Sequence, residues 1–194
     1  MWAPNLPQWA GVALGAMSSG GTVTGINPSY TERELKAQLA DSGASVVVTV
    51  PSLVPAAFSA ATSTGVHEVV VLGLAEGEAE RATSVLDLIG GDEPVPGPTV
   101  GPDAVAFLPY SSGTTGMPKG VMLTHSNLVA SVRQVRSGLR ITGKDTTLAV
   151  APFFHIMGFV VSLAVPLHVR VQEGRVPLVR EAGYRARRIR PDAG

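Results

Sequence analysis

The 194-residue chain contains no cysteine. It therefore has no disulfide framework, no thiolate metal site and no cysteine nucleophile, which fits a reducing compartment. Charged residues (15%) and aromatic residues (5%) are also scarce, whereas hydrophobic residues make up 45% of the chain. A sequence this apolar is not disordered over most of its length, because it has ample surface to bury. Its length suits one domain or a piece of a larger one.

The chain also has no net charge, because 15 basic residues balance 15 acidic ones. Zero formal charge argues against a nucleic-acid partner for the whole chain. The distribution is uneven, because residues 169–194 hold seven arginines and only three acidic residues. We expect residues 168–194 to form a basic, poorly ordered tail, either solvated and without a partner or directed at an anionic surface.

No basic segment followed by an apolar core opens the sequence, so a secretory signal is not indicated and a cytoplasmic location is expected. The long apolar run 148–169 raises the possibility of a membrane span. It is interrupted by Pro152, His155 and Pro166. A buried segment is the better interpretation, and we expect no membrane span.

Helical and strand patterns alternate through the first 72 residues. The helical patterns cover 8–18, 31–41 and 53–64, and the strand patterns cover 22–26, 46–50 and 68–72. Thr31 and Glu34 have the spacing of a capping box, and Gly43 is placed to end that helix. Continuous β-branched runs are typical of strands buried on both faces. The alternation predicts an α/β fold with a mostly parallel sheet covered by helices.

The second half of the chain begins after a loop, 90–103, that carries four prolines and predicts a subdomain joint. Strands are expected over 104–110, 120–124 and 146–150. Helices are expected from Ser126, as N-cap, to about 137, and over 159–167.

The stretch Tyr110–Gly120 concentrates hydroxyls, glycines and one lysine between two of these strands. Glycines let backbone amides approach an anion closely, hydroxyls add donors, and lysine adds a mobile positive charge. Such a loop suits a polyphosphate. The expected ligands are Ser111, Ser112, Gly113, Thr114, Thr115, Gly116 and Lys119. A flexible linker is the alternative, but linkers do not usually join two strands, and the spacing differs from a Walker A loop.

Residues 108–125 resemble the phosphate-binding signature of the adenylate-forming acyl-CoA synthetase superfamily. Two further blocks, 20–35 and 152–158, resemble the same family in order and spacing. Within the family, the sequences of these blocks are most similar to those of 4-coumarate-CoA ligases and bacterial acyl-CoA ligases. The resemblance implies that residues 1–167 are part of the large N-terminal, AMP-binding domain of that fold.

The resemblance also implies a reaction: a carboxylic acid and ATP give acyl-adenylate and pyrophosphate, and CoA then takes the acyl group. Lys119 and His155 are the implied catalytic residues, and His155, Met157 and Val161 the implied lining of the acyl pocket. From composition alone, His155 and Met157 could instead be packed core residues.

Several elements of the family pattern have no counterpart in the sequence, among them the adenine, ribose and Mg²⁺ ligands and the C-terminal domain with its lysine. We therefore expect no metal site in the chain and a ligase fragment that is inactive alone. The alternative is a non-catalytic nucleotide-binding or polyphosphate-binding fragment, or an interaction fragment.

Overall fold

A computed structural model of the chain describes residues 1–73, 81–89, 97–111 and 118–172. Its sheet region comprises α1 (Pro7–Ser18), α2 (Glu32–Ser42), β1 (Val46–Thr49), η1 (Pro51–Leu53), α3 (Val54–Ala61), β2 (Glu68–Val71), β3 (Thr83–Ser84) and α4 (Val85–Leu88). The later elements are β4 (Val105–Phe107), β5 (Tyr110–Ser111), β6 (Lys119–Gly120), β7 (Leu123–Thr124), α5 (His125–Leu139), the π-helix η3 (Gly158–Ala164) and α6 (Val165–Gln172).

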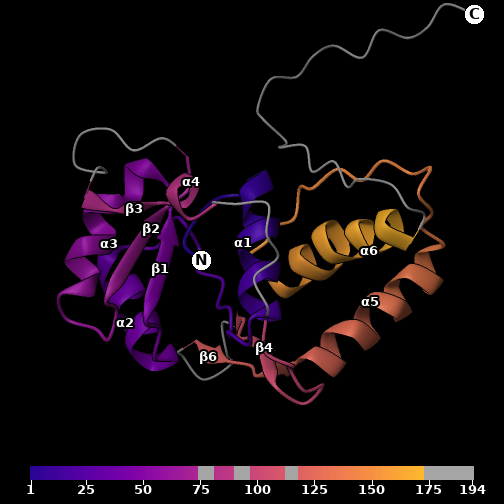
Figure 1. Ribbon diagram of the computed structural model, residues 1–194, viewed down its shortest axis with the longest axis horizontal. Helices are drawn as coiled ribbons and strands as arrows, with labels where there is room; N and C mark the ends of the chain where they lie inside the picture. The colour runs from indigo at the N-terminus through magenta and orange to yellow at the C-terminus, as the bar shows by residue number, and fades with distance from the viewer. Residues whose placement is uncertain (74–80, 90–96, 112–117, 173–194) are drawn as a thin grey trace, which may run out of the picture.

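A parallel three-stranded sheet, in the order β1-β2-β3, organises the first region (Figure 1). Because side chains alternate along a strand, the two faces of β1 and β2 bury different residues. Val47 and Val69 pack with helices α2 and α3, whereas Val48 and Val70 join the cluster that contains α1. The predicted α/β fold, with a parallel sheet covered by helices, is confirmed.

Helix α2 begins and ends where the sequence predicts. The Thr31 hydroxyl accepts from the Glu34 amide, and the Glu34 carboxylate accepts from the Thr31 amide at 2.8 Å. Gly43 closes the helix in the left-handed conformation, with φ 62°, which glycine adopts at no steric cost. Both helix signals are confirmed.

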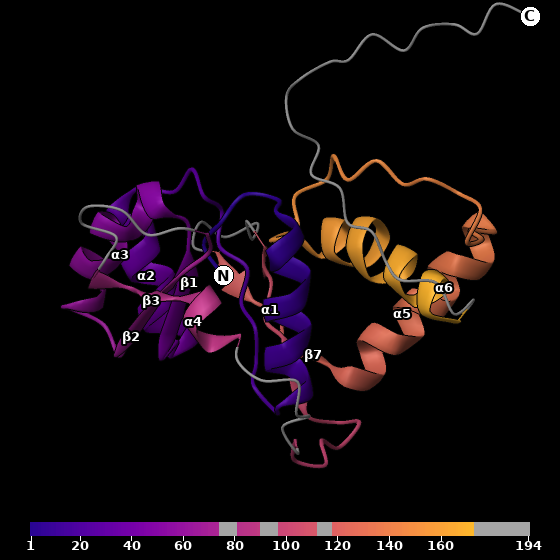
Figure 2. The same cartoon turned by 45° about the horizontal axis from the view of Figure 1, so that its top comes forward.

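Helix α1 lies between the parallel sheet and the pair of helices α5 and α6 (Figures 1 and 2). Trp9 on α1 is fully buried and contacts the rings of Phe153 and Phe159, with centroids 6.0 and 6.1 Å away. Phe159 also stacks on Phe107 of β4, at 4.5 Å. These aromatic contacts join the two regions of the molecule.

Five of the predicted elements differ in the structure. The expected strand 104–110 is divided between β4 and β5, with residues 108–109 in neither. The expected strand 22–26 is a single bridge, from Val23 to Phe107. The expected strand 120–124 is divided between β6 and β7, which pair antiparallel with β5 and β4. Residues 146–150 form no strand, and the expected helix 159–167 is a π-helix that continues as α6.

The N-cap of α5 is Thr124 and not Ser126, because Thr124 and Asn127 form a second capping box. The predicted joint falls in part on residues 90–96, which lie outside the described residues, as does most of the predicted tail. Helix α6 runs through the expected domain boundary at 167. Both boundaries stay predictions. No helix among the described residues has the length and apolar character needed to cross a membrane.

Candidate functional site

The stem of the signature loop is a short antiparallel ladder. Strands β5 and β6 pair Tyr110 with Gly120 and Ser111 with Lys119. Ser111 and Lys119 are both exposed, and they face each other where the loop begins and ends. Strands β5 and β6 form a two-stranded sheet of their own, separate from the three-stranded sheet. Ser112, Gly113, Thr114, Thr115 and Gly116 lie outside the described residues.

Tyr110 anchors this stem to helix α2. Its hydroxyl donates to the Asp41 carboxylate at 2.5 Å. Burial, and then the neighbouring Asp41 carboxylate, raise the pKa of the Tyr110 hydroxyl well above its usual value. The hydroxyl therefore stays protonated and keeps donating at neutral pH. Tyr110 and Pro118 also line a cavity of about 610 Å³ against α2.

The segment 23–25 connects the β5–β6 stem, called here the signature stem, with residues 152–158, called here the His155 motif. The Thr24 hydroxyl donates to the carbonyl of Leu108, two residues before Tyr110, at 2.8 Å. On the other side, a Cβ added at Gly25 would lie 2.6 Å from the Phe154 backbone, so only glycine permits this approach. Buried Gln38 holds the segment in place by donating to the Thr24 hydroxyl and the Gly25 carbonyl, both at 3.1 Å.

Asn5 holds the chain that leads to His155. Its amide nitrogen donates to the carbonyls of Ala149 and Ala151, at 3.1 and 3.0 Å. Its amide oxygen accepts from the Phe153 backbone at 2.7 Å. These bonds fix residues 149–153 to Asn5.

His155 is exposed and begins the turn into η3. Its backbone donates to the Pro152 carbonyl at 3.0 Å, and its Nδ1 accepts from the Met157 amide at 3.3 Å. In the neutral ring the proton therefore lies on Nε2, which leaves Nε2–H as a donor. Met157 is 61% exposed and Val161 is half-buried. The exposure of His155 and Met157 does not fit the alternative in which both are core residues.

The structure thus holds the signature stem and the His155 motif on the same segment, 23–25. Four residues that do this positioning were not identified as site residues from the sequence: Asn5, Thr24, Gln38 and Asp41. Their partners lie up to 148 residues away in the chain, so no local pattern marks them. Among the described residues, no group of three His, Asp or Glu side chains could hold a metal ion.

Comparison with known proteins agrees with this architecture. The model of the family described as "AMP-binding enzyme" matches residues 1–178. The chain belongs to the AMP-binding enzyme family. A 4-coumarate-CoA ligase of Pinus taeda is 39% identical over 158 residues, and 4-coumarate-CoA ligase 5 of Oryza sativa subsp. japonica is 42% identical over 160 residues.

A crystal structure of a long-chain-fatty-acid-CoA ligase from Archaeoglobus fulgidus shares the AMP-binding fold, with a TM-score of 0.74 and 32% identity. It aligns with 90% of this chain, which covers 33% of that protein. The two plant ligases align with 79% of this chain, which covers 29% and 28% of them. The chain therefore spans less than a third of the length of these relatives.

Proposed function

We propose that the chain contains the phosphate-binding part of an ATP-dependent carboxylate–CoA ligase. The observation that carries this proposal is the β5–β6 stem, which sets Ser111 opposite Lys119 at the two ends of the signature loop. Both side chains are exposed, and the Asp41–Tyr110 bond fixes the stem to α2. An ammonium and a hydroxyl held on such a stem fit the triphosphate of ATP.

In the proposed reaction, a carboxylate oxygen of the acid attacks the α-phosphorus of ATP, and the bond from that phosphorus to the leaving pyrophosphate breaks. Negative charge grows on the pyrophosphate, where Lys119, Ser111 and the proposed donors at 112–116 would stabilise it. Losing one donor at such a site typically raises the barrier by about 3 to 4 kcal/mol. The CoA thiolate then attacks the acyl carbon and releases AMP.

His155 is proposed to contact the reacting carboxylate through Nε2–H, because its Nδ1 is already occupied by the Met157 amide. Met157 and Val161 follow at positions 2 and 6 residues further on and are proposed to line the acyl pocket. Their apolar side chains fit an aryl or alkyl acid.

The residues described here do not fit a magnesium site, since they contain no group of carboxylates or histidines close enough to share an ion. We assign no step to a metal held by this chain. The acid, ATP and CoA are the proposed small-molecule partners, and a cytoplasmic location stays a prediction.

Calorimetric titration of ATP into the full chain tests the proposal. We expect binding that weakens at least tenfold in Lys119→Ala, because that variant removes the only described cation on the stem. Lys144→Ala, another exposed lysine, is the control and should bind as the parent does. A parent that does not bind ATP, or a Lys119→Ala variant that binds equally well, would refute the proposal.

Turnover is a separate question for a chain that spans less than a third of its relatives. We expect no pyrophosphate release when a carboxylic acid is added with ATP and Mg²⁺. Acid-dependent release that disappears in Lys119→Ala would contradict this expectation and show a complete activity in the chain. ATP binding without release supports the phosphate-binding part alone.

A further inference from the structure

The part of the molecule formed by α5, η3 and α6 is strongly basic. From His125 to Gln172 the sequence has five lysines and arginines and a single acidic residue, Asp145. Helix α5 contains no acidic residue at all. Like charges three or four residues apart on a helix repel each other, and here no carboxylate on the same helix offsets them.

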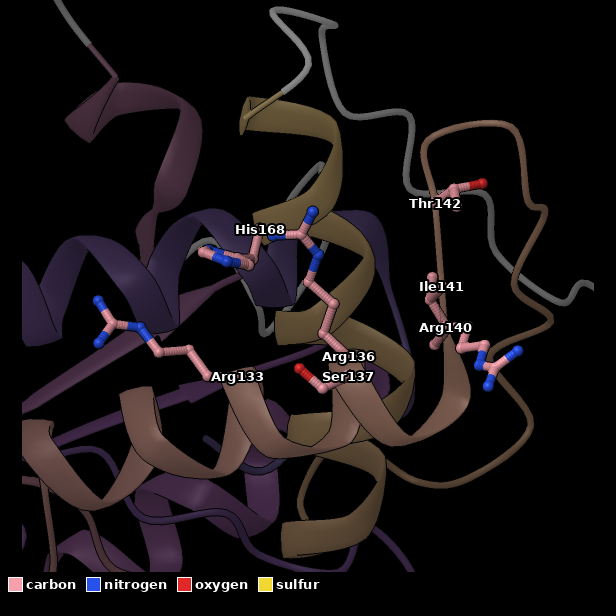
Figure 3. A pocket seen from close by; sticks show the side chains of 7 residues that line it. All are labelled: Arg133, Arg136, Ser137, Arg140, Ile141, Thr142 and His168. Carbon is pink, nitrogen blue, oxygen red and sulfur yellow. The ribbon is translucent and has the colours of Figure 1, made fainter.

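Several of these cations line one cavity between α5 and α6, with a volume of about 600 Å³ (Figure 3). Arg136 and Ser137 lie three and four residues after Arg133, which places these three side chains along one face of α5. Arg140 follows as the C-cap of α5, in the left-handed conformation with φ 53°. Figure 3 shows Arg136 extending towards His168, which comes from α6. Ile141 and Thr142 complete the lining.

The nearby acidic residue is already occupied. The Asp145 carboxylate accepts from the Thr142 amide at 2.7 Å and from the Thr142 hydroxyl at 2.9 Å. The hydrogen bond from the Thr142 amide has the larger effect and that from the Thr142 hydroxyl the smaller, and both lower the pKa of Asp145. The carboxylate therefore stays ionised and remains bound to Thr142. In the part of the chain that the structure describes, the recorded ion pair joins Lys36 to Glu32, and neither Arg133 nor Arg140 has a carboxylate partner.

Helix stabilisation accounts for only part of this arrangement. Cations near the C-terminus of a helix interact favourably with its dipole, an effect confined to about the last turn. Arg136 and Arg140 lie there, but Arg133 lies nearly two turns from the end of α5. A ligand that contacts Arg133 explains the place of that arginine in the lining, which the helix dipole does not.

We propose that the α5–α6 cavity binds a multiply phosphorylated small molecule. Guanidinium groups bind phosphate through paired, charge-assisted hydrogen bonds, and the hydroxyls of Ser137 and Thr142 add uncharged donors. The volume suits a small molecule. Ile141 is the single apolar side chain in the lining, which contains no Phe, Tyr or Trp. Recognition therefore depends on the phosphates and not on a base or acyl group.

The test uses inorganic tripolyphosphate and the full chain carrying Lys119→Ala, so that the signature stem contributes as little as possible. We expect calorimetry to show one binding event. Adding Arg133→Gln and Arg140→Gln should weaken it at least tenfold and reduce the dependence of log affinity on log salt by about two. Thermal melts that match the parent keep loss of folding from imitating loss of binding.

Lys36→Gln with Arg81→Gln is the matched control, because it removes the same charge from the sheet region, where Lys36 is half-buried and paired with Glu32 and Arg81 is exposed. It should leave the affinity unchanged. The proposal is overturned if the Lys119→Ala chain does not bind tripolyphosphate, or if both double variants weaken binding equally. Binding that depends on Arg133 and Arg140 but never on Lys119 would support this cavity and refute the proposed function.

Discussion

The sheet region, residues 1–89, and the helical region, residues 119–172, bury their side chains in different ways. In the sheet region both faces of the β1–β2 pair are covered, with separate apolar clusters on each. The helical region contributes to one of those clusters only. Of the twelve large hydrophobic residues that are exposed among the described residues, seven lie from Val121 onward.

This difference reflects which contacts determine the conformation of each region. The sheet region forms from local signals and from contacts between consecutive elements, such as β1, α3 and β2. The helical region depends on distant residues: Asn5 holds 149–153, Gly25 contacts Phe154, and Trp9 contacts Phe153 and Phe159. Changes at those few contacts should therefore disturb the helical region more than changes on the exposed faces of its own helices.

The largest expected effect comes from Gly158→Ala. A Cβ at this position would lie 2.0 Å from the carbonyl oxygen of Pro152, and backbone on both sides must shift to relieve the clash. We expect a loss of about 3 kcal/mol in the free energy of unfolding, measured by urea denaturation.

Gly138→Ala in α5 is the matched control, since nothing lies within 4 Å of its added Cβ. Alanine favours the helix interior, so this variant should gain about 0.5 to 1 kcal/mol. Equal behaviour of the two alanine variants would show that the turn from Pro152 to Gly158 is not constrained as described.

A smaller effect is expected for Asn5→Ala, which removes all three bonds to residues 149–153. Two carbonyls and one amide then lose their partners, at a cost of about 2 kcal/mol. Hydrogen exchange should accelerate at the Phe153 amide and leave the β1–β2 ladder protected.

Asn5→Asp separates the roles of the two amide atoms. The carboxylate can still accept from the Phe153 amide but cannot donate to the carbonyls of Ala149 and Ala151. Its stability should fall between the parent and Asn5→Ala. Uniform acceleration of exchange over both regions in Asn5→Ala would mean that Asn5 supports the whole fold and not the helical region in particular.

The same contrast explains which features the sequence could predict. The capping box at Thr31, the glycine at position 43 and the β-branched strands depend on neighbours within a few residues, and all three are confirmed. The strand expected at 146–150 is wrong, and the end of that segment is held at the Ala149 carbonyl by a side chain from the other end of the chain. A single sequence contains no local mark of such a contact.

The candidate site also has a part that the sequence predicts and a part that only the fold reveals. The hydroxyl and glycine pattern predicts a loop between two strands, and the structure adds the β5–β6 stem that pairs Ser111 with Lys119 at its ends. The Asp41–Tyr110 bond spans 69 residues and the Thr24–Leu108 bond spans 84. Side chains of common types make these bonds, so they could be recognised only once the fold had brought them together.

The smallest effect compares two helix caps of the same design, one in each region. Thr31→Ala at α2 and Thr124→Ala at α5 each remove a side chain that accepts from the backbone three residues on. Each should cost about 1 kcal/mol at neutral pH. The caps differ in their second residue, which is the carboxylate of Glu34 in α2 and the neutral amide of Asn127 in α5.

That difference predicts that the cost of removing the cap depends on pH in α2 and does not in α5. Hydrogen bonds from the Thr31 hydroxyl and amide lower the pKa of Glu34. Its contribution is therefore present above the usual glutamate pKa and is lost as pH falls through the lowered value. Urea denaturation should show the cost of Thr31→Ala shrinking in acid while the cost of Thr124→Ala stays constant. A pH-independent Thr31→Ala cost would mean that the Glu34 carboxylate adds nothing to the cap.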